Sequence, residues 1–237
     1  MKLTKAQTKA HEQAMELVEA AEAGTVITDN DREFILDHYH PGAAHNIGKG
    51  GVFFTPREVA DTAAGFHNGG GRVLDACAGI GCLAYHLKAW SRSAKLTCVE
   101  INPEFVRVGR VVVPDAEWIC GSVFDILPQL RQFDSAISNP PFGQIGSAAS
   151  FNFADAQFAV MELMTRHTKQ GAIVIIPDAD HSMEDRRDRH LSRNHIKFRE
   201  MYPAWHITPC SVDMAVFKDK WKGANPKVMI CDLSKDS

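Results

Sequence analysis

The residues with the clearest chemical character stand where an apolar stretch ends, at Asn139, Pro140, Pro141 and Phe142. The preceding stretch, FDSAIS at 133–138, has the composition of a buried strand. Proline has no backbone N–H, so a strand cannot continue through two of them in a row. The chain therefore ends a strand by presenting an amide side chain, two rigid backbone units and an aromatic ring. The simplest alternative is a turn that only terminates the strand.

A glycine loop forms the second cluster. In LDACAGIGCLA, Gly79, Gly81 and Ala84 match the GxGxxG/A spacing between a strand and a helix. Glycines permit a tight turn and a close backbone approach to a ligand. Glu100 ends the next strand, about the right distance along the chain to hold a ribose diol. This pattern fits a nicotinamide or flavin enzyme as well as an S-adenosylmethionine enzyme, and a glycine turn needed only for packing is the simplest alternative.

An acidic residue before the glycines helps to separate these cofactors. Dinucleotide sites place a pyrophosphate at the helix N-terminus, where the carboxylate of Asp75 would repel it. S-adenosylmethionine carries an ammonium and a sulfonium, which suit a carboxylate that acts directly or through water. Asp75 therefore favours S-adenosylmethionine.

Four motifs in a fixed order resemble a known family. FFTP (53–56), DACAGIG (75–81), VEIN (99–102) and NPPF (139–142) occur in the order found in amino-group adenine methyltransferases. Bacterial and phage DNA adenine-N6 enzymes are the nearest likeness, and it covers roughly residues 50–178. NPPF is typical of methylation of planar nitrogens, whereas FFTP is informative mainly in this combination.

The resemblance implies a role for each motif. Asn139, Pro140, Pro141 and Phe142 would be catalytic. Ser122 stands where the family often has an acid for the cofactor's adenine, with Asp125 three residues later, and either could bind it. The cofactor-binding residues implied in this way are Phe54, Thr55 and Pro56 at the methionine end, Asp75, Gly79 and Gly81 along the cofactor, Glu100 at the ribose, and Ile101, Ser122 and Asp125 near the adenine.

The NPPF residue types suit this chemistry. The N6 lone pair of adenine is delocalised into the ring, so the nitrogen is a poor nucleophile. Two acceptors aimed at its N–H hydrogens, the Asn139 side-chain oxygen and the Pro140 carbonyl, would make it more tetrahedral and stabilise its developing charge. Consecutive prolines restrict backbone movement, and Phe142 can stack on a flipped base.

The elements that must position these residues alternate from residue 72 onward. Strands are expected at 72–77, 95–100, 116–120, 133–138, 171–177, 211–218 and 227–233, the last two as antiparallel neighbours. Helices are expected at 82–90, 103–112 and 153–168. Earlier helices are expected at 5–24, in 28–40, and after Thr55, which could cap a helix with Pro56 at its first position. The pattern predicts an α/β fold, a mostly parallel sheet with helices on both faces. With the resemblance, this implies a Rossmann-like methyltransferase sheet, divided into a helical N-terminal extension (1–50) and a methyltransferase domain (51–237).

Composition limits the remaining choices. The chain has 237 residues and a net charge of −3, so its overall charge does not indicate that it binds nucleic acid. It has neither a signal-peptide pattern nor a membrane-length apolar run, and its histidines and cysteines show no metal-site spacing, so we expect a cytoplasmic protein without a metal or membrane. A basic stripe could contact phosphates or be an ordinary solvated helix face; its members are Arg186, Arg189, Arg193 and Lys197.

The function predicted from the sequence is methyl transfer from S-adenosylmethionine to adenine N6, with DNA as the first expected partner and RNA as the second. Protein glutamine methylation is a further alternative in the same class. A nicotinamide oxidoreductase would explain neither Asp75 nor NPPF, and a binding module without turnover is the remaining alternative.

Overall fold

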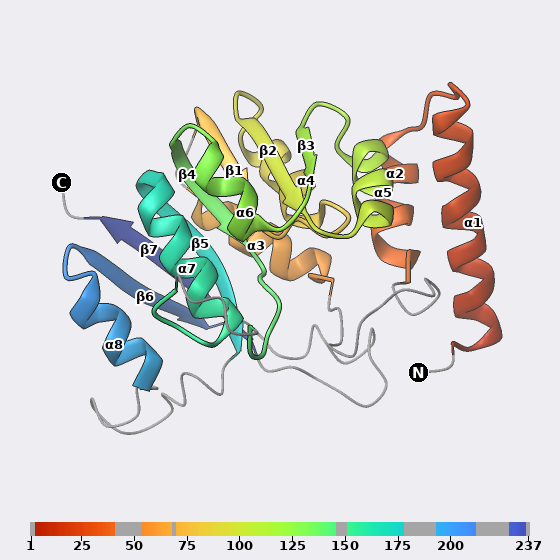
Figure 1. Ribbon diagram of the computed structural model, residues 1–237. Helices are drawn as coiled ribbons and strands as arrows, with labels where there is room; N and C mark the ends of the chain where they lie inside the picture. Colours follow the sequence, from red (N-terminus) through yellow and green to blue (C-terminus); the bar gives the residue numbers. More distant parts are fainter. Residues whose placement is uncertain are drawn as a thin grey trace.

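A central sheet runs through the molecule (Figure 1). The computed structural model describes residues 3–40, 54–67, 70–145, 151–177, 193–211 and 228–235. Within these residues the sheet has seven strands in the order β3-β2-β1-β4-β5-β7-β6. Strands β1 to β5 run parallel, while β7 is antiparallel to both β5 and β6. The strands are β1 (Arg72–Asp75), β2 (Lys95–Glu100), β3 (Glu117–Cys120), β4 (Phe133–Ser138), β5 (Thr168–Pro177), β6 (Trp205–Ser211) and β7 (Val228–Lys235).

Helices cover both faces of this sheet. They are α1 (Lys5–Glu22), α2 (Asp29–His38), α3 (Arg57–Phe66), α4 (Cys82–Trp90), α5 (Pro103–Val112), α6 (Val123–Ile126) with the short 3-10 turn η2 (Leu127–Gln129), α7 (Ala156–His167) and α8 (Arg193–Met201). Alternate strand residues belong to different cores, because successive side chains of a strand point to opposite faces. Val73 packs in the core under α3, α4 and α5, and Leu74 in the core under α6, α7 and α8. The expected α/β sheet with helices on both faces is confirmed.

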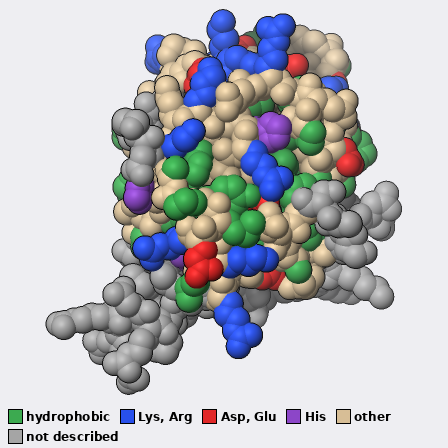
Figure 2. Space-filling view, turned by 60° about the vertical axis from the view of Figure 1, so that its left-hand side comes forward, with side chains coloured by type: hydrophobic (Ala, Val, Ile, Leu, Met, Phe, Trp, Pro, Cys, Tyr) green, Lys and Arg blue, Asp and Glu red, His purple; other side chains and the backbone are tan. Residues whose placement is uncertain are grey.

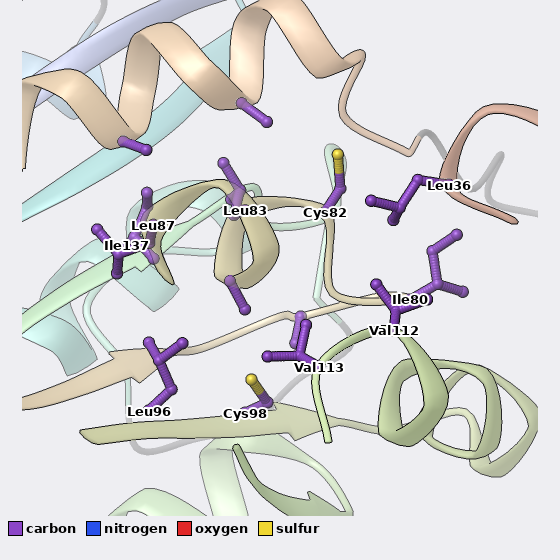
Figure 3. Packing of buried hydrophobic residues seen from close by; sticks show 14 of the residues in the cluster. Leu36, Ile80, Cys82, Leu83, Leu87, Leu96, Cys98, Val112, Val113 and Ile137 are labelled. Atoms are coloured by element: carbon purple, nitrogen blue, oxygen red, sulfur yellow. The ribbon is translucent and has the colours of Figure 1, made fainter. Parts of the chain in front are cut away.

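The first core joins α4 to the strands beneath it (Figure 3). Leu87 of α4, Leu96 of β2 and Ile137 of β4 belong to one cluster and are almost completely buried. Burying a leucine or isoleucine side chain contributes about 1.5–3 kcal/mol. This core holds the start of α4, and with it the end of the glycine loop, against the sheet.

The N-terminal helices belong to the same core. Thr4 and Thr28 cap α1 and α2 through reciprocal hydrogen bonds with the third residue of each helix. Val18 of α1 and Ile35 of α2 are fully buried in the cluster, and Arg107 of α5 forms an ion pair with Glu22. The predicted domain boundary at residue 50 lies outside the described residues, so that division stays a prediction.

One prediction about elements was wrong, and one strand was not predicted. Thr55 does not cap α3: the helix begins at Arg57, Pro56 occupies the cap position, and no side chain caps it. Before β7 the structure has a strand at Trp205–Ser211 that was not predicted, whereas the predicted strand at 211–218 lies outside the described residues except for Ser211. β6 pairs antiparallel with β7, whereas the expected pairing of 211–218 with the last strand lies outside the described residues beyond Ser211 and stays a prediction. In the part of the chain that the structure describes, no helix is both long and apolar enough to cross a membrane.

Candidate functional site

The glycine loop joins β1 to α4 with a backbone that only glycine adopts readily. Gly79 and Gly81 have φ values of 56° and 90°. A Cβ at Gly79 would lie 3.3 Å from the Phe54 ring. The missing side chain therefore lets Phe54 pack directly against the loop backbone.

Glu100 is fixed beside this loop. Its Oε2 accepts a hydrogen bond from the Gly79 N–H at 2.9 Å, and its Oε1 accepts one from the Asn102 N–H at 2.8 Å. Burial raises the pKa of Glu100, and these backbone donors partly oppose the rise. A carboxylate has about four acceptor positions, so Glu100 can still accept hydrogen bonds from a ligand.

Asp75 lies behind the loop and is completely buried. Among the residues that the structure describes, neither carboxylate oxygen has a partner of normal hydrogen-bond geometry, although the backbone N–H groups of Cys77 and Ala84 are near enough to lower its pKa in part. Burial and the Glu100 charge together raise the pKa of Asp75 to about 8. Asp75 does not line the pocket described next, although its neighbour Ala76 does.

A pocket of about 270 Å³ opens at the carboxyl ends of β1, β2 and β4. This is where open α/β sheets bind their ligands. The predicted site residues that line the pocket are Phe54, Gly79, Glu100, Ile101, Ser122, Asn139, Pro140, Pro141 and Phe142. The predicted residues outside the lining are Thr55, Pro56, Asp75, Gly81 and Asp125. Of the two candidates for the cofactor's adenine, Ser122 lines the pocket and Asp125 does not.

Asn139 is held by a residue from a distant part of the sequence. Its Nδ2 donates a hydrogen bond to Thr55 Oγ1 at 3.0 Å. Its Oδ1 is buried and has no hydrogen-bond partner among the described residues. A buried acceptor left in this way costs about 1–3 kcal/mol, so such a group at a pocket wall indicates a place for a ligand donor.

Aromatic residues that sequence reasoning missed complete the wall. Phe105 of α5 lines the pocket and packs edge-on against Phe54, with ring centroids 5.1 Å apart. Tyr39, which follows α2, contacts both rings. Phe124 lines the pocket near Ser122 and packs against Phe151 at 4.6 Å. Phe124 is an aromatic residue two positions after Ser122, and this closeness in sequence to a predicted site residue could have identified it.

The predicted basic stripe is only partly described. Arg186 and Arg189 lie outside the described residues, while Arg193 and Lys197 lie on α8. Lys197 donates to the Asn152 carbonyl and lies 5.0 Å from the centre of the Phe153 ring. Arg193 is exposed. Figure 2 shows Lys and Arg side chains spread over the side of the molecule that carries α8 and β6, with hydrophobic side chains between them.

Comparison with known proteins adds a family and a fold. Residues 62–197, more than half of the chain, match the profile of the methyltransferase small domain. No curated protein sequence matches the chain.

Three solved structures illustrate the likeness. The first is a Listeria monocytogenes protein assigned to the class I S-adenosylmethionine-dependent methyltransferases, with a TM-score of 0.71 and 15% identity over 99% of this chain and 82% of that chain. The second is the methyltransferase subunit of a type I restriction-modification system from Streptococcus thermophilus, with a TM-score of 0.66 and 17% identity over 88% of this chain and 49% of that chain. The third is precorrin-6y C5,15-methyltransferase from Geobacter metallireducens, with a TM-score of 0.51 and 14% identity over 85% of this chain and 97% of that chain. At these identities the likeness establishes the Rossmann-like fold.

Proposed function

Because the chain belongs to the methyltransferase small domain family, we propose that it transfers a methyl group to the N6 amino group of adenine in DNA. S-adenosylmethionine is the cofactor, and when bound it supplies the activated methyl group. The choice of adenine rests on the resemblance of the FFTP and NPPF motifs to those of adenine-N6 methyltransferases. The choice of DNA rests on the same combination of motifs, which is nearest to that of the DNA enzymes.

The residues present fit this cofactor. Gly79 of the glycine loop lines the pocket, and Glu100 at the neighbouring strand end can accept from ribose hydroxyls. Ser122 and Ile101 would lie near the adenine of the cofactor. Asp75 does not line the pocket, and its raised pKa leaves its carboxyl largely uncharged at neutral pH, so we assign it no charge interaction with the cofactor.

The observation that carries the proposal is the buried Oδ1 of Asn139 at the pocket wall, for which the described part of the chain supplies no hydrogen-bond partner. An amine that enters the pocket would supply the missing donor. The Asn139 oxygen and the Pro140 carbonyl would each accept one N–H of the target amine and stabilise the charge that develops on nitrogen. Phe142, which also lines the pocket, would stack on the base.

Asn139→Ala tests this role. Losing one preorganised group costs on the order of 100-fold in rate, so we expect at least that loss in methyl transfer. Affinity for S-adenosylhomocysteine, measured by calorimetry, should stay within about twofold, because the variant keeps Glu100 and the glycine loop. Gln129→Ala is the matched control, since its amide donates to the Asp125 carbonyl outside the pocket.

The same assay identifies the substrate. Unmethylated DNA and RNA are incubated in parallel with the protein and S-adenosylmethionine, and the nucleosides are analysed by mass spectrometry. N6-methyladenine in DNA is the expected product. The same product only in RNA would replace DNA as the substrate, and full activity of Asn139→Ala would contradict the assigned chemistry.

A further inference from the structure

Two adjacent residues of the FFTP segment contact two different parts of the pocket. Phe54 packs against the glycine loop, where a Cβ at Gly79 would come within 3.3 Å of its ring. Thr55 is joined instead to Asn139, 84 residues further along the chain, by the hydrogen bond from Asn139 Nδ2. Thr55 does not line the pocket. Phe54 therefore belongs to the side of the pocket where the cofactor would bind. Thr55 instead contacts Asn139, the residue that would hold the target amine.

An asparagine side chain needs such a contact if it is to present one fixed group. The terminal torsion of asparagine is broad, so the amide plane rotates easily when nothing holds it. Its two ends have opposite hydrogen-bonding character, because the oxygen accepts and the nitrogen donates. If Asn139 turned its Nδ2 toward the target amine, two hydrogen-bond donors would face each other and no hydrogen bond would form. When Nδ2 is engaged by Thr55, Oδ1 is the end that remains to accept.

We propose that Thr55 is a positioning residue, whose hydroxyl holds the Asn139 amide so that Oδ1 is available to the target amine. This inference rests on the proposed function. It differs from the role implied by the sequence resemblance, in which Thr55 lies along the methionine end of the cofactor. The two roles predict different effects, because a cofactor contact sets affinity for the cofactor and a positioning contact sets the rate of transfer.

Thr55→Val removes the hydroxyl while keeping the branched shape, and Thr55→Ser keeps the hydroxyl. A hydrogen bond of ordinary strength corresponds to a change of about tenfold. We expect kcat of Thr55→Val to fall by about that factor while the affinity for S-adenosylhomocysteine changes by less than about twofold. Thr55→Ser should recover most of the rate. Thr62→Val is the matched control, since its hydroxyl donates to the Glu58 carbonyl within α3.

A double variant separates positioning from a general structural effect. If Thr55 acts only through Asn139, Thr55→Val should cause no further loss of rate in an Asn139→Ala background. Independent, multiplicative losses would overturn the proposal. A parallel fall in S-adenosylhomocysteine affinity in Thr55→Val would also overturn it and would return Thr55 to the cofactor.

A measurement without substrate keeps the inference separate from the proposed function. The side-chain amide of Asn139 gives an NMR signal that can be identified by its disappearance in Asn139→Asp. In the natural protein its exchange with solvent should be slow, and in Thr55→Val faster by about tenfold, the factor expected for one lost hydrogen bond. Unchanged exchange would refute the contact whatever the substrate is. Faster exchange in a protein that methylates no adenine would contradict the proposed function but not the contact.

Discussion

Among single residues, Asp75 is an acid that its surroundings keep protonated near neutral pH. Its pKa is raised to about 8, first by burial and then by repulsion from Glu100. In the unfolded chain the same carboxyl ionises near pH 4. Between about pH 4 and pH 8 the folded protein therefore binds one more proton than the unfolded chain. The stability that Asp75 contributes is complete below about pH 4 and is lost as pH rises toward 8.

We predict a matching decline in the free energy of unfolding. Asp75 should contribute a fall of roughly 1 kcal/mol per pH unit in this window, measured by urea unfolding at several pH values. Asp75→Asn should flatten the decline, because the amide does not ionise. Asp134→Asn is the control: the pKa of Asp134 is lowered by the Arg72 N–H and Lys169, so this carboxyl stays ionised throughout the window. A decline of unchanged slope in Asp75→Asn would contradict this role of Asp75 and would assign the decline to other carboxyls with raised pKa values, such as Glu100.

The sequence made it possible to single out residues whose types are unusual for their position in the fold. Asn139 and Glu100 stand at strand ends, and parallel strands bring such ends to one edge of the sheet. Thr55 was misassigned because a threonine before a proline is also a helix-start pattern. Its actual partner is 84 residues away. No local pattern specifies such a contact, because it depends on how β4 and the FFTP segment pack.

At the scale of elements, α5 approaches β3 through a contact that requires glycine. A Cβ at Gly109 would lie only 2.1 Å from a carbon of the Trp118 ring. That ring is fixed, because its Nε1 donates to the Val113 carbonyl at 3.1 Å. The close packing of this pair holds α5, which carries Phe105 of the pocket wall, against the sheet.

Gly109→Ala should therefore destabilise the protein. Alanine favours a helix by about 1 kcal/mol over glycine, but overpacking of this kind typically costs about 1–3 kcal/mol. We expect a net loss of up to about 2 kcal/mol, seen as a lower urea midpoint. Gly65→Ala in α3 is the matched variant. Its Cβ would meet the Trp90 ring at an ordinary 3.5 Å, so it should leave stability unchanged or raise it by up to about 1 kcal/mol. Equal effects of the two substitutions would contradict the role of the Trp118 contact.

Elements with a strong pattern could be predicted from the sequence, and one weakly patterned strand could not. The boundaries of β2, β4, α4 and α5 agree with those expected, because their apolar residues follow the strand or helix period over the whole element. Strand β6 contains Pro209 and polar residues and escaped prediction. It lies at the end of the sheet order. An edge strand pairs on one side only and tolerates a proline, so its sequence carries less of the usual signal.

For the whole molecule, the question is how a chain with a net charge of −3 would hold a nucleic acid. Local basic surface can supply the attraction that net charge does not. The side of the molecule that carries α8 shows spread Lys and Arg side chains (Figure 2). Helix α8 is also linked to the segment that follows NPPF, through Asn194 to Asp155 and Lys197 to Asn152. Its first turn is therefore held near the chain that leaves the pocket.

Arg193 and Lys197 form a matched pair for testing this surface. Lys197 is used within the protein, on the Asn152 carbonyl and over the Phe153 ring, whereas Arg193 is exposed at the start of α8. If Arg193 meets a phosphate, Arg193→Ala should weaken DNA binding for every sequence and reduce the salt dependence of the binding constant by about one phosphate contact. Lys197→Ala should instead lower the thermal midpoint and leave the salt slope unchanged, because it removes an internal contact. Binding measured over a range of salt concentrations distinguishes these effects. An unchanged slope in Arg193→Ala, with cofactor affinity intact, would make this end of α8 an ordinary solvated helix face and would direct the search for the nucleic-acid surface to α1 and α2.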